Sequence, residues 1–134
     1  APPQSASELA EPINTLESQE DPDGAWRQYV NEKLSGPYQR LFAQLDLLIM
    51  LAAPSFEVVF SWRQKQEHKL RQSTQAGAGP NLMDDKALKR FIMHYERITR
   101  AMLKQLPARA DCVISLSDEQ QPQNVSWKSA TSGA

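Results

Sequence analysis

The sequence is poor in cysteine and histidine, which limits the chemistry it can carry. Cys112 is its one cysteine, and His68 and His94 are its two histidines. A single thiol cannot form a disulfide within the chain, and neither histidine has a second His or Cys at metal-ligand spacing. We therefore expect no metal site built from these residue types. Cys112 lies in the apolar run CVISL, which indicates a buried and unreactive thiol.

The sequence also lacks a long apolar run and an excess of charge of either sign. No stretch reaches the roughly 18 apolar residues of a membrane span, and no charged-then-apolar start resembles a signal peptide. Fifteen Lys and Arg residues oppose sixteen Asp and Glu residues, so the formal net charge is -1. These absences argue against a membrane or nucleic-acid partner. Together with the single thiol, they favour a cytoplasmic protein.

Motifs of common nucleotide and hydrolase sites are missing as well. The glycine-rich GAGP at residues 77–80 is not followed by the Lys-Ser or Lys-Thr of a P-loop, so we interpret it as a hinge loop. No serine lies in a nucleophile-elbow pattern. We expect His68 on a solvated helix face and His94 partly exposed, and neither as a catalytic group.

What the sequence does contain is a series of helical patterns. Residues 1–24 hold several prolines and few apolar residues, which predicts an extended lead-in that ends at the turn signal DPDG. Helices are predicted to begin near residues 25, 36, 55 and 84, the last of them ending near residue 106. This last helix carries an apolar stripe at 3.6-residue spacing, with Tyr95 in the core and Arg97 at the surface. Residues 122–134 are predicted to be a tail.

Two short apolar runs, LLIMLAA and CVISLS, are predicted to be strands over about residues 46–53 and 111–117. Short continuous apolar runs are typical of strands that are buried on both faces. Two such strands joined through helices predict an α/β fold with a right-handed parallel crossover. Because two strands alone would leave both edges exposed, we expect pairing with further strands. These would come from a larger α/β domain or from a second copy in a homodimer.

The run SWRQKQEHKLR, residues 61–71, turns abruptly basic and contains Glu67 as its only acid. On a helix, Glu67 lies one turn from Arg63 and from Arg71, which favours a solvated face that leaves the core after Trp62. However, this helix follows a strand, and open parallel sheets bind ligands outside the carboxyl ends of their strands. Arginine there can hold phosphate oxygens bidentately. Charge alone leaves both interpretations open.

Three parts of the sequence together resemble a known family: EDPDGAWRQYVNEKLSGPYQRLF, LLIMLAAPSFEVVFSWRQKQEHKLR and MDDKALKRFIMHYERITRAMLKQLPARADCVISLSDEQ. They resemble the C-terminal half of bacterial P-loop kinases related to D-glycerate 3-kinase, in the group of uridine kinase, phosphoribulokinase and pantothenate kinase. The resemblance covers about residues 3–121. It rests on the combination of AP-x-F-x-x-V-x-x-WR-x-x-QE with F-x-x-HYER-x-T.

The resemblance implies the C-terminal part of a three-layer P-loop kinase fold, in which residues 25–121 include lid-like helices. It implies ATP, Mg²⁺ and transfer of the γ-phosphoryl group to a hydroxyl acceptor such as glycerate. Arg63, which matches WR-x-x-QE, is the implied phosphate contact on the lid side, with Lys69 and Arg71 as further candidates. Gln121 and Pro122 are implied to flank the adenine ring, by analogy with where P-loop kinases hold the base.

The sequence departs from this family in one major respect, because it contains no G-x-x-x-x-G-K-[ST] motif. The P-loop, its lysine and Mg²⁺ supply most of the catalysis of phosphoryl transfer. We therefore expect no catalytic or metal-binding residue in this chain, no activity of the chain alone, and a need for the N-terminal half of the parent kinase. A different hypothesis is a non-catalytic helical interaction module, in which the Trp26 face and the helix over residues 88–106 bind a partner.

Overall fold

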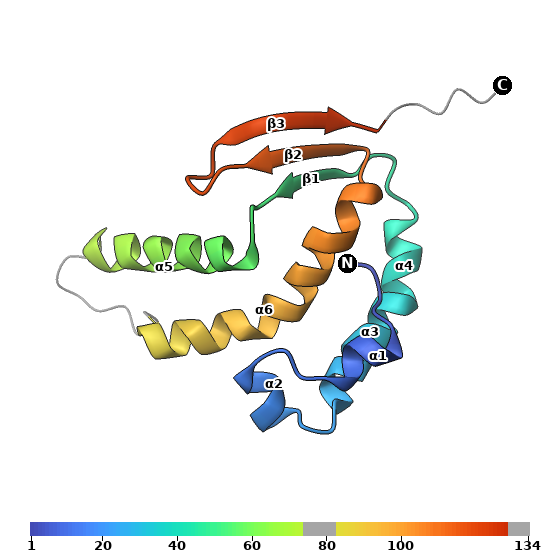
Figure 1. Cartoon of the computed structure of the whole chain (residues 1–134), viewed down its shortest axis with the longest axis horizontal. Coiled ribbons are helices and arrows are strands. Elements are labelled where there is room, and N and C mark those ends of the chain that lie inside the picture. Colours follow the sequence, from blue (N-terminus) through green and yellow to red (C-terminus); the bar gives the residue numbers. More distant parts are fainter. Residues whose placement is uncertain (74–82, 129–134) are drawn as a thin grey trace.

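Figure 1 shows a mixed α/β arrangement, with a small sheet at one side of a largely helical body. The computed structural model describes residues 1–73 and 83–128. The GAGP segment, which we predicted to be a hinge loop, lies outside the described residues. In the described part of the chain, no helix has the length and apolarity that crossing a bilayer requires.

The sheet contains the two predicted strands and one that was not predicted. β1 (Ile49–Ala52) pairs in parallel with β2 (Cys112–Leu116), which confirms that the two predicted strands are parallel. β3 (Pro122–Trp127) then pairs antiparallel with β2, giving the order β1-β2-β3. The prediction of a tail over residues 122–134 was therefore wrong for residues 122–127, which form a strand. β3 forms because a short turn, in which Gln120 adopts a φ of 63°, folds the chain back onto β2.

One face of this sheet is apolar and largely uncovered, contrary to the prediction of strands buried on both faces. Register partners across a sheet point to the same side, so Leu51, Ile114 and Val125 form one row. A second row contains Ile49 and Trp127, with the buried Cys112 between them. Leu51 is 64% exposed and Trp127 also 64%. We call these two rows the open sheet face; the described helices bury Met50 on the opposite face but leave this one accessible.

α3 (Ala25–Ser35) and α4 (Pro37–Phe42) form close to where they were predicted. Gly24 precedes α3 with a φ of 72°, a left-handed conformation that glycine adopts without strain. Pro37 begins α4, where its missing N–H removes no helical hydrogen bond. These helices expose much of their apolar surface, and Trp26 stacks on Tyr29 at 5.6 Å between ring centroids while remaining 64% exposed.

α5 (Phe56–Ser73) and α6 (Asp85–Gln105) pack against each other, and η1 (Leu106–Ala108) then leads into β2. Both helix starts are capped as predicted. The Ser55 hydroxyl accepts from the Val58 N–H at 3.3 Å, and the Asp84 carboxylate accepts from the Ala87 N–H at 2.7 Å. The core between the two helices consists of Phe56, Leu88 and Ile92, with Phe60 and Met83 packed against it.

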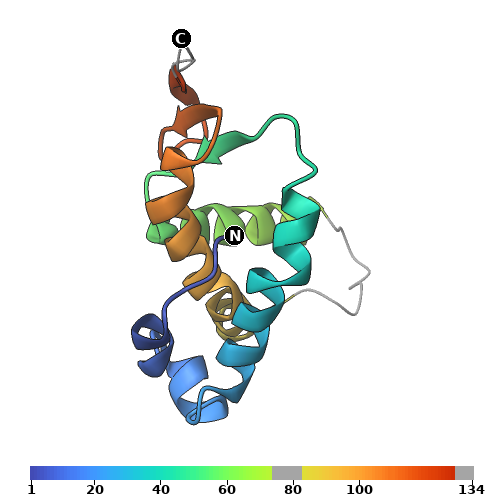
Figure 2. The same ribbon diagram turned by 90° about the vertical axis from the view of Figure 1, so that its right-hand side faces the viewer.

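The lead-in is helical rather than extended, which corrects the prediction for residues 1–24. It contains α1 (Ala6–Ala10) and α2 (Thr15–Glu20), which begin at the side-chain caps Ser5 and Asn14. Both short helices lie beside α3 and α6 (Figure 2). A helix this short is unstable alone, so the contacts with the rest of the chain must hold it in place.

A buried arginine makes these contacts, which reverses the predicted roles of two neighbours on α6. Arg97, expected at the surface, is 7% exposed, whereas Tyr95, expected in the core, is 54% exposed. The Arg97 guanidinium donates to both carboxylate oxygens of Glu17, at 2.8 and 2.7 Å, and to the carbonyls of Glu8 and Glu11, each at 2.6 Å. Arg97 therefore ties both lead-in helices to α6.

Arg27 on α3 completes this cluster from the other side. It is 5% exposed and donates to the carbonyls of Leu9, at 3.0 Å, and Asp21, at 2.7 Å. It also pairs with the Asp21 carboxylate at 3.4 Å and lies 4.0 Å from that of Glu17. Two buried arginines, Arg27 and Arg97, thus fix the lead-in, and Glu17 is the carboxylate that lies near both of them.

We expect Glu17 to make the stability of the protein sensitive to acid. Burial disfavours its charged form, but the hydrogen bonds from Arg97 and from the Ile13 N–H outweigh burial, so the pKa of Glu17 lies below its ordinary 4.5. A group with a lowered folded-state pKa stabilises fully above its unfolded pKa, and this contribution is lost as the pH falls through the folded value. Urea unfolding should show Glu17→Gln to be less stable than the wild type at neutral pH. The difference in free energy of unfolding between the two proteins should decrease steadily below pH 4.5. A difference that does not change with pH would contradict a lowered pKa of Glu17.

Candidate functional site

The carboxyl ends of β1 and β2 open into a hollow at the edge of the sheet. Residues 52–54 at the end of β1 and residues 115–119 at the end of β2 line it, together with Gln121 and Gln123, and its volume is about 760 Å³. A neighbouring hollow of about 680 Å³ lies between the loop residues 118–120 and α5. Because Asp118 and Glu119 line both hollows, we treat them as one region, the carboxyl-edge site. In open parallel sheets this is the usual position of ligands.

One wall of the carboxyl-edge site is cationic. Arg63, Lys65 and Lys69 project from α5 into the hollow between this helix and the loop after β2. The Trp62 indole N–H donates to the Asp118 carbonyl, which fixes the loop against the helix. The sequence pattern thus places three basic side chains on the face of α5 that turns toward the strand ends.

Arg63 is held in this wall by its own helix. One guanidinium nitrogen donates to the Gln66 side-chain carbonyl at 2.9 Å, and the other lies 3.2 Å from the Glu67 carboxylate. Glu67 is only 2% exposed, so the prediction of a solvated face with surface ion pairs was wrong at this residue. The prediction that the helix leaves the core after Trp62 was also wrong, because Glu67 accepts a hydrogen bond from the Met83 N–H at 3.1 Å.

The structure brings some of the predicted site residues together and separates others. Arg63 and Lys69 line the same hollow, and Gln121 lines the adjoining one. Arg71 instead donates to the Met83 carbonyl and pairs with Asp85 at 3.7 Å, so it lies at the start of α6. Pro122 is the first residue of β3 and is not among the residues that line the hollows.

Lys65 is the site residue that sequence reasoning did not select. It lies on the same side of α5 as Trp62 and lines the hollow with Arg63. Its spacing of one helical turn from Lys69 was the available signal. The histidines lie elsewhere: the His68 ring contacts the Gln72 amide at 3.0 Å, and the His94 ring lies 2.9 Å from the Arg90 carbonyl.

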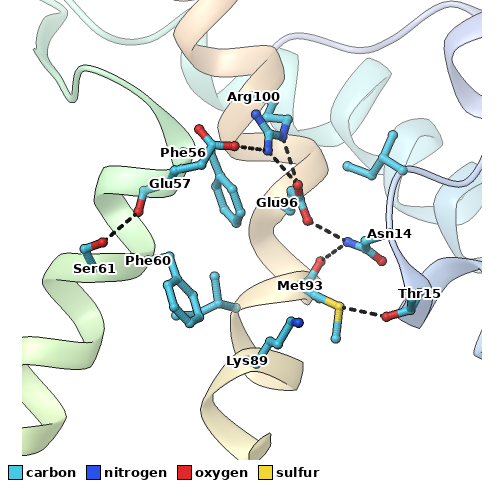
Figure 3. A pocket seen from close by; sticks show the side chains of 12 residues that line it. Asn14, Thr15, Phe56, Glu57, Phe60, Ser61, Lys89, Met93, Glu96 and Arg100 are labelled. Atoms are coloured by element: carbon cyan, nitrogen blue, oxygen red, sulfur yellow. Dashed lines mark hydrogen bonds and ion pairs between the residues drawn. The ribbon is translucent and has the colours of Figure 1, made fainter. Parts of the chain in front are cut away.

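A separate pocket of about 540 Å³ lies between α2, α5 and α6 (Figure 3). Its floor is apolar, with Phe56, Phe60 and Ile92. Much of its polar rim is already paired, because Arg100 binds the carboxylates of both Glu57 and Glu96. The hydrogen bond to Arg100 lowers the pKa of Glu57 below its ordinary value. This pocket therefore suits a polyanion less well than the cationic wall of the carboxyl-edge site does.

A comparison with known proteins finds partial similarity to a protein that is named as a kinase. Over 67 residues, half of this chain, the sequence is 36% identical to a protein of the fission yeast Schizosaccharomyces pombe (strain 972 / ATCC 24843) described as "Uncharacterized kinase mug58". The matched residues make up 22% of the yeast protein, so the chain spans less than a quarter of this relative. No family model and no solved structure matches the chain. The chain is thus related in part to a kinase-named protein.

Proposed function

We propose that the chain is part of an ATP-dependent small-molecule kinase with a P-loop fold, which transfers the γ-phosphoryl group to a hydroxyl acceptor such as glycerate. The observation that carries this proposal is the cationic wall of Arg63, Lys65 and Lys69 beside the carboxyl ends of two parallel strands. The partial similarity to a kinase-named yeast protein supports the same reading. Arg71 drops out of the proposed contacts because it is engaged by Asp85 and the Met83 carbonyl.

The residues present fit the phosphates of ATP better than they fit its metal ion. Arg63 and the two lysines can neutralise phosphate charge, which grows at the oxygens of the transferring group. We propose Gln121, which lines the strand-end hollow, as a contact for the adenine ring, and Pro122, the next residue in the chain, as a weaker candidate. Among the described residues, no group of three or more His, Cys, Asp or Glu side chains is arranged to hold a metal ion. In this proposal Mg²⁺ and the Walker A loop therefore belong to the N-terminal half of the parent kinase.

The open sheet face supports a need for this further polypeptide. β1 is an edge strand of the sheet that the described residues form, and parallel sheets are normally covered on both faces. We propose that the N-terminal half pairs with the β1 edge and covers Leu51 and Val125. The coding sequence upstream of Ala1 tests this directly. A Walker A motif there would support the proposal, and a start codon immediately before the Ala1 codon would count against it.

Replacement of Arg63 tests the proposed phosphate contact. We expect Arg63→Ala to weaken binding of inorganic tripolyphosphate to the 134-residue chain by roughly tenfold, because a charged hydrogen bond to phosphate is lost. Isothermal titration calorimetry at low salt measures the affinity. Lys104→Ala, which removes an exposed charge from the last turn of α6, is the matched control and should bind like the wild type. An equal loss of affinity in both variants would mean that tripolyphosphate binding depends on the net charge of the chain and not on a specific contact with Arg63.

One observation favours the alternative of a non-catalytic interaction module. Trp26 and Tyr29 expose a stacked aromatic pair on α3, and large exposed aromatic surfaces are typical of binding interfaces. In this alternative α5 is merely solvated on its basic side. Failure of the wild type to bind either tripolyphosphate or ATP, together with a partner that protects Trp26, would decide for the module.

A further inference from the structure

Glu67 occupies an unusual place for an acidic residue in a basic helix. It is 2% exposed, and each of its two carboxylate oxygens faces a different group. Oε1 accepts from the Met83 N–H at 3.1 Å, and Oε2 lies 3.2 Å from a guanidinium nitrogen of Arg63. Arg71 binds the Met83 carbonyl from the next turn of α5. The start of α6 is thus joined to α5 through both backbone polar groups of one residue.

We propose that Glu67 is a positioning residue, which fixes the Arg63 guanidinium at the anion site and links it to the start of α6. This inference rests on the proposed phosphate contact of Arg63. Arg63 cannot leave Glu67 to follow a ligand, because a buried carboxylate would then lose its counter-charge. It must bind an anion while it stays on Glu67, through the N–H groups that Glu67 and Gln66 do not use.

The benefit of this arrangement is a donor that is oriented before the ligand arrives. A free arginine loses side-chain entropy when it is ordered on binding, and a residue that is already held does not. The opposing effect is electrostatic, since the Glu67 charge repels an incoming anion. If orientation dominates, removal of the Glu67 carboxylate should weaken anion binding. If charge repulsion dominates, its removal should tighten anion binding.

Glu67→Gln separates them because an amide cannot serve both neighbours. Gln has one acceptor oxygen, so its NH₂ group would face either the Met83 N–H or the Arg63 guanidinium, donor against donor. Glu119→Gln is the matched control, since Glu119 is an exposed carboxylate that lines the same hollow. We expect Glu67→Gln to weaken tripolyphosphate binding by roughly threefold or more, whereas Glu119→Gln should tighten it. Tightening in both variants would overturn the positioning role.

NMR of the arginine side chains measures, without any ligand, whether Glu67 holds the Arg63 guanidinium. In the wild-type chain the Arg63 guanidinium should rotate slowly about its Nε–Cζ bond, because both terminal nitrogens are held by Gln66 and Glu67. The Met83 amide should be protected from exchange. A freely rotating Arg63 in the wild type would overturn the proposal even if the Glu67 variant did not fold. If the wild-type chain shows a slowly rotating Arg63 but does not bind tripolyphosphate, the proposed function is wrong, whereas the contacts of Glu67 with Arg63 and Met83 are correct.

Discussion

Arg97→Met is expected to destabilise the protein by about 3–5 kcal/mol, the range for breaking a buried ion pair by removing one partner. Methionine keeps most of the apolar volume, so the loss reports mainly on the polar contacts. Without the guanidinium, the carbonyls of Glu8 and Glu11 lose a donor each, and the half-buried Glu17 carboxylate loses the two donors from Arg97. Urea unfolding measures the loss. Amide exchange should also show α1 and α2 opening well below the global free energy of unfolding.

Arg90→Met on the same helix is the control for this prediction. Arg90 also pairs with a lead-in carboxylate, that of Glu20, but both side chains are about half exposed. Exposed pairs contribute about 0–1 kcal/mol, so this variant should lie close to the wild type. If Arg97→Met and Arg90→Met cost the same, burial of the Arg97 contacts would not be the source of its effect.

Leu88→Ala is expected to destabilise the protein by about 2–5 kcal/mol, because Leu88 is 0% exposed at the centre of the α5–α6 core. The deleted atoms lose their contacts with Phe56 and Ile92, and the large side chains around them cannot fully close the space. Thermal and urea unfolding both measure this loss. The same substitution in the sheet provides the control.

Leu51→Ala removes an identical group from the open sheet face, where Leu51 is 64% exposed. We expect a change within about 0.5 kcal/mol for the chain alone, as is usual for surface positions. A loss as large as that of Leu88→Ala would show that Leu51 is buried in solution, for example in a dimer. That result would point to pairing of two copies through the sheet.

Patterns that depend on local sequence predicted much of the fold. The apolar runs located β1 and β2, and caps such as Ser55 and Asp84 located the helix starts to within a residue or two. β3 escaped prediction because its sequence, PQNVSW, is mostly polar and begins with proline. Its pairing depends on the neighbouring strand and not on its own residues, so local propensity carried little information.

Long-range charge pairing could not be predicted in the same way. Arg97 is buried because Glu17 and two carbonyls, more than 75 positions earlier, converge on it. Glu67 is buried because it reaches Met83 beyond the end of its own helix. Arginine and glutamate are surface residues by default, so sequence reasoning assigned both to solvent. For the site, Arg63 and Lys69, which the same reasoning selected as phosphate contacts, line one hollow. The reasoning could not show that Arg71 pairs with Asp85 and the Met83 carbonyl.

The buried position of Cys112 has a practical consequence for work on this molecule. It is the single cysteine of the sequence, and it is 2% exposed between its register partners Ile49 and Trp127. A second cysteine introduced on the surface would therefore be the one thiol that reacts quickly with a dye or spin label. Spectroscopic labels can thus be attached singly to α5 or to the loop after β2 without first removing a native residue.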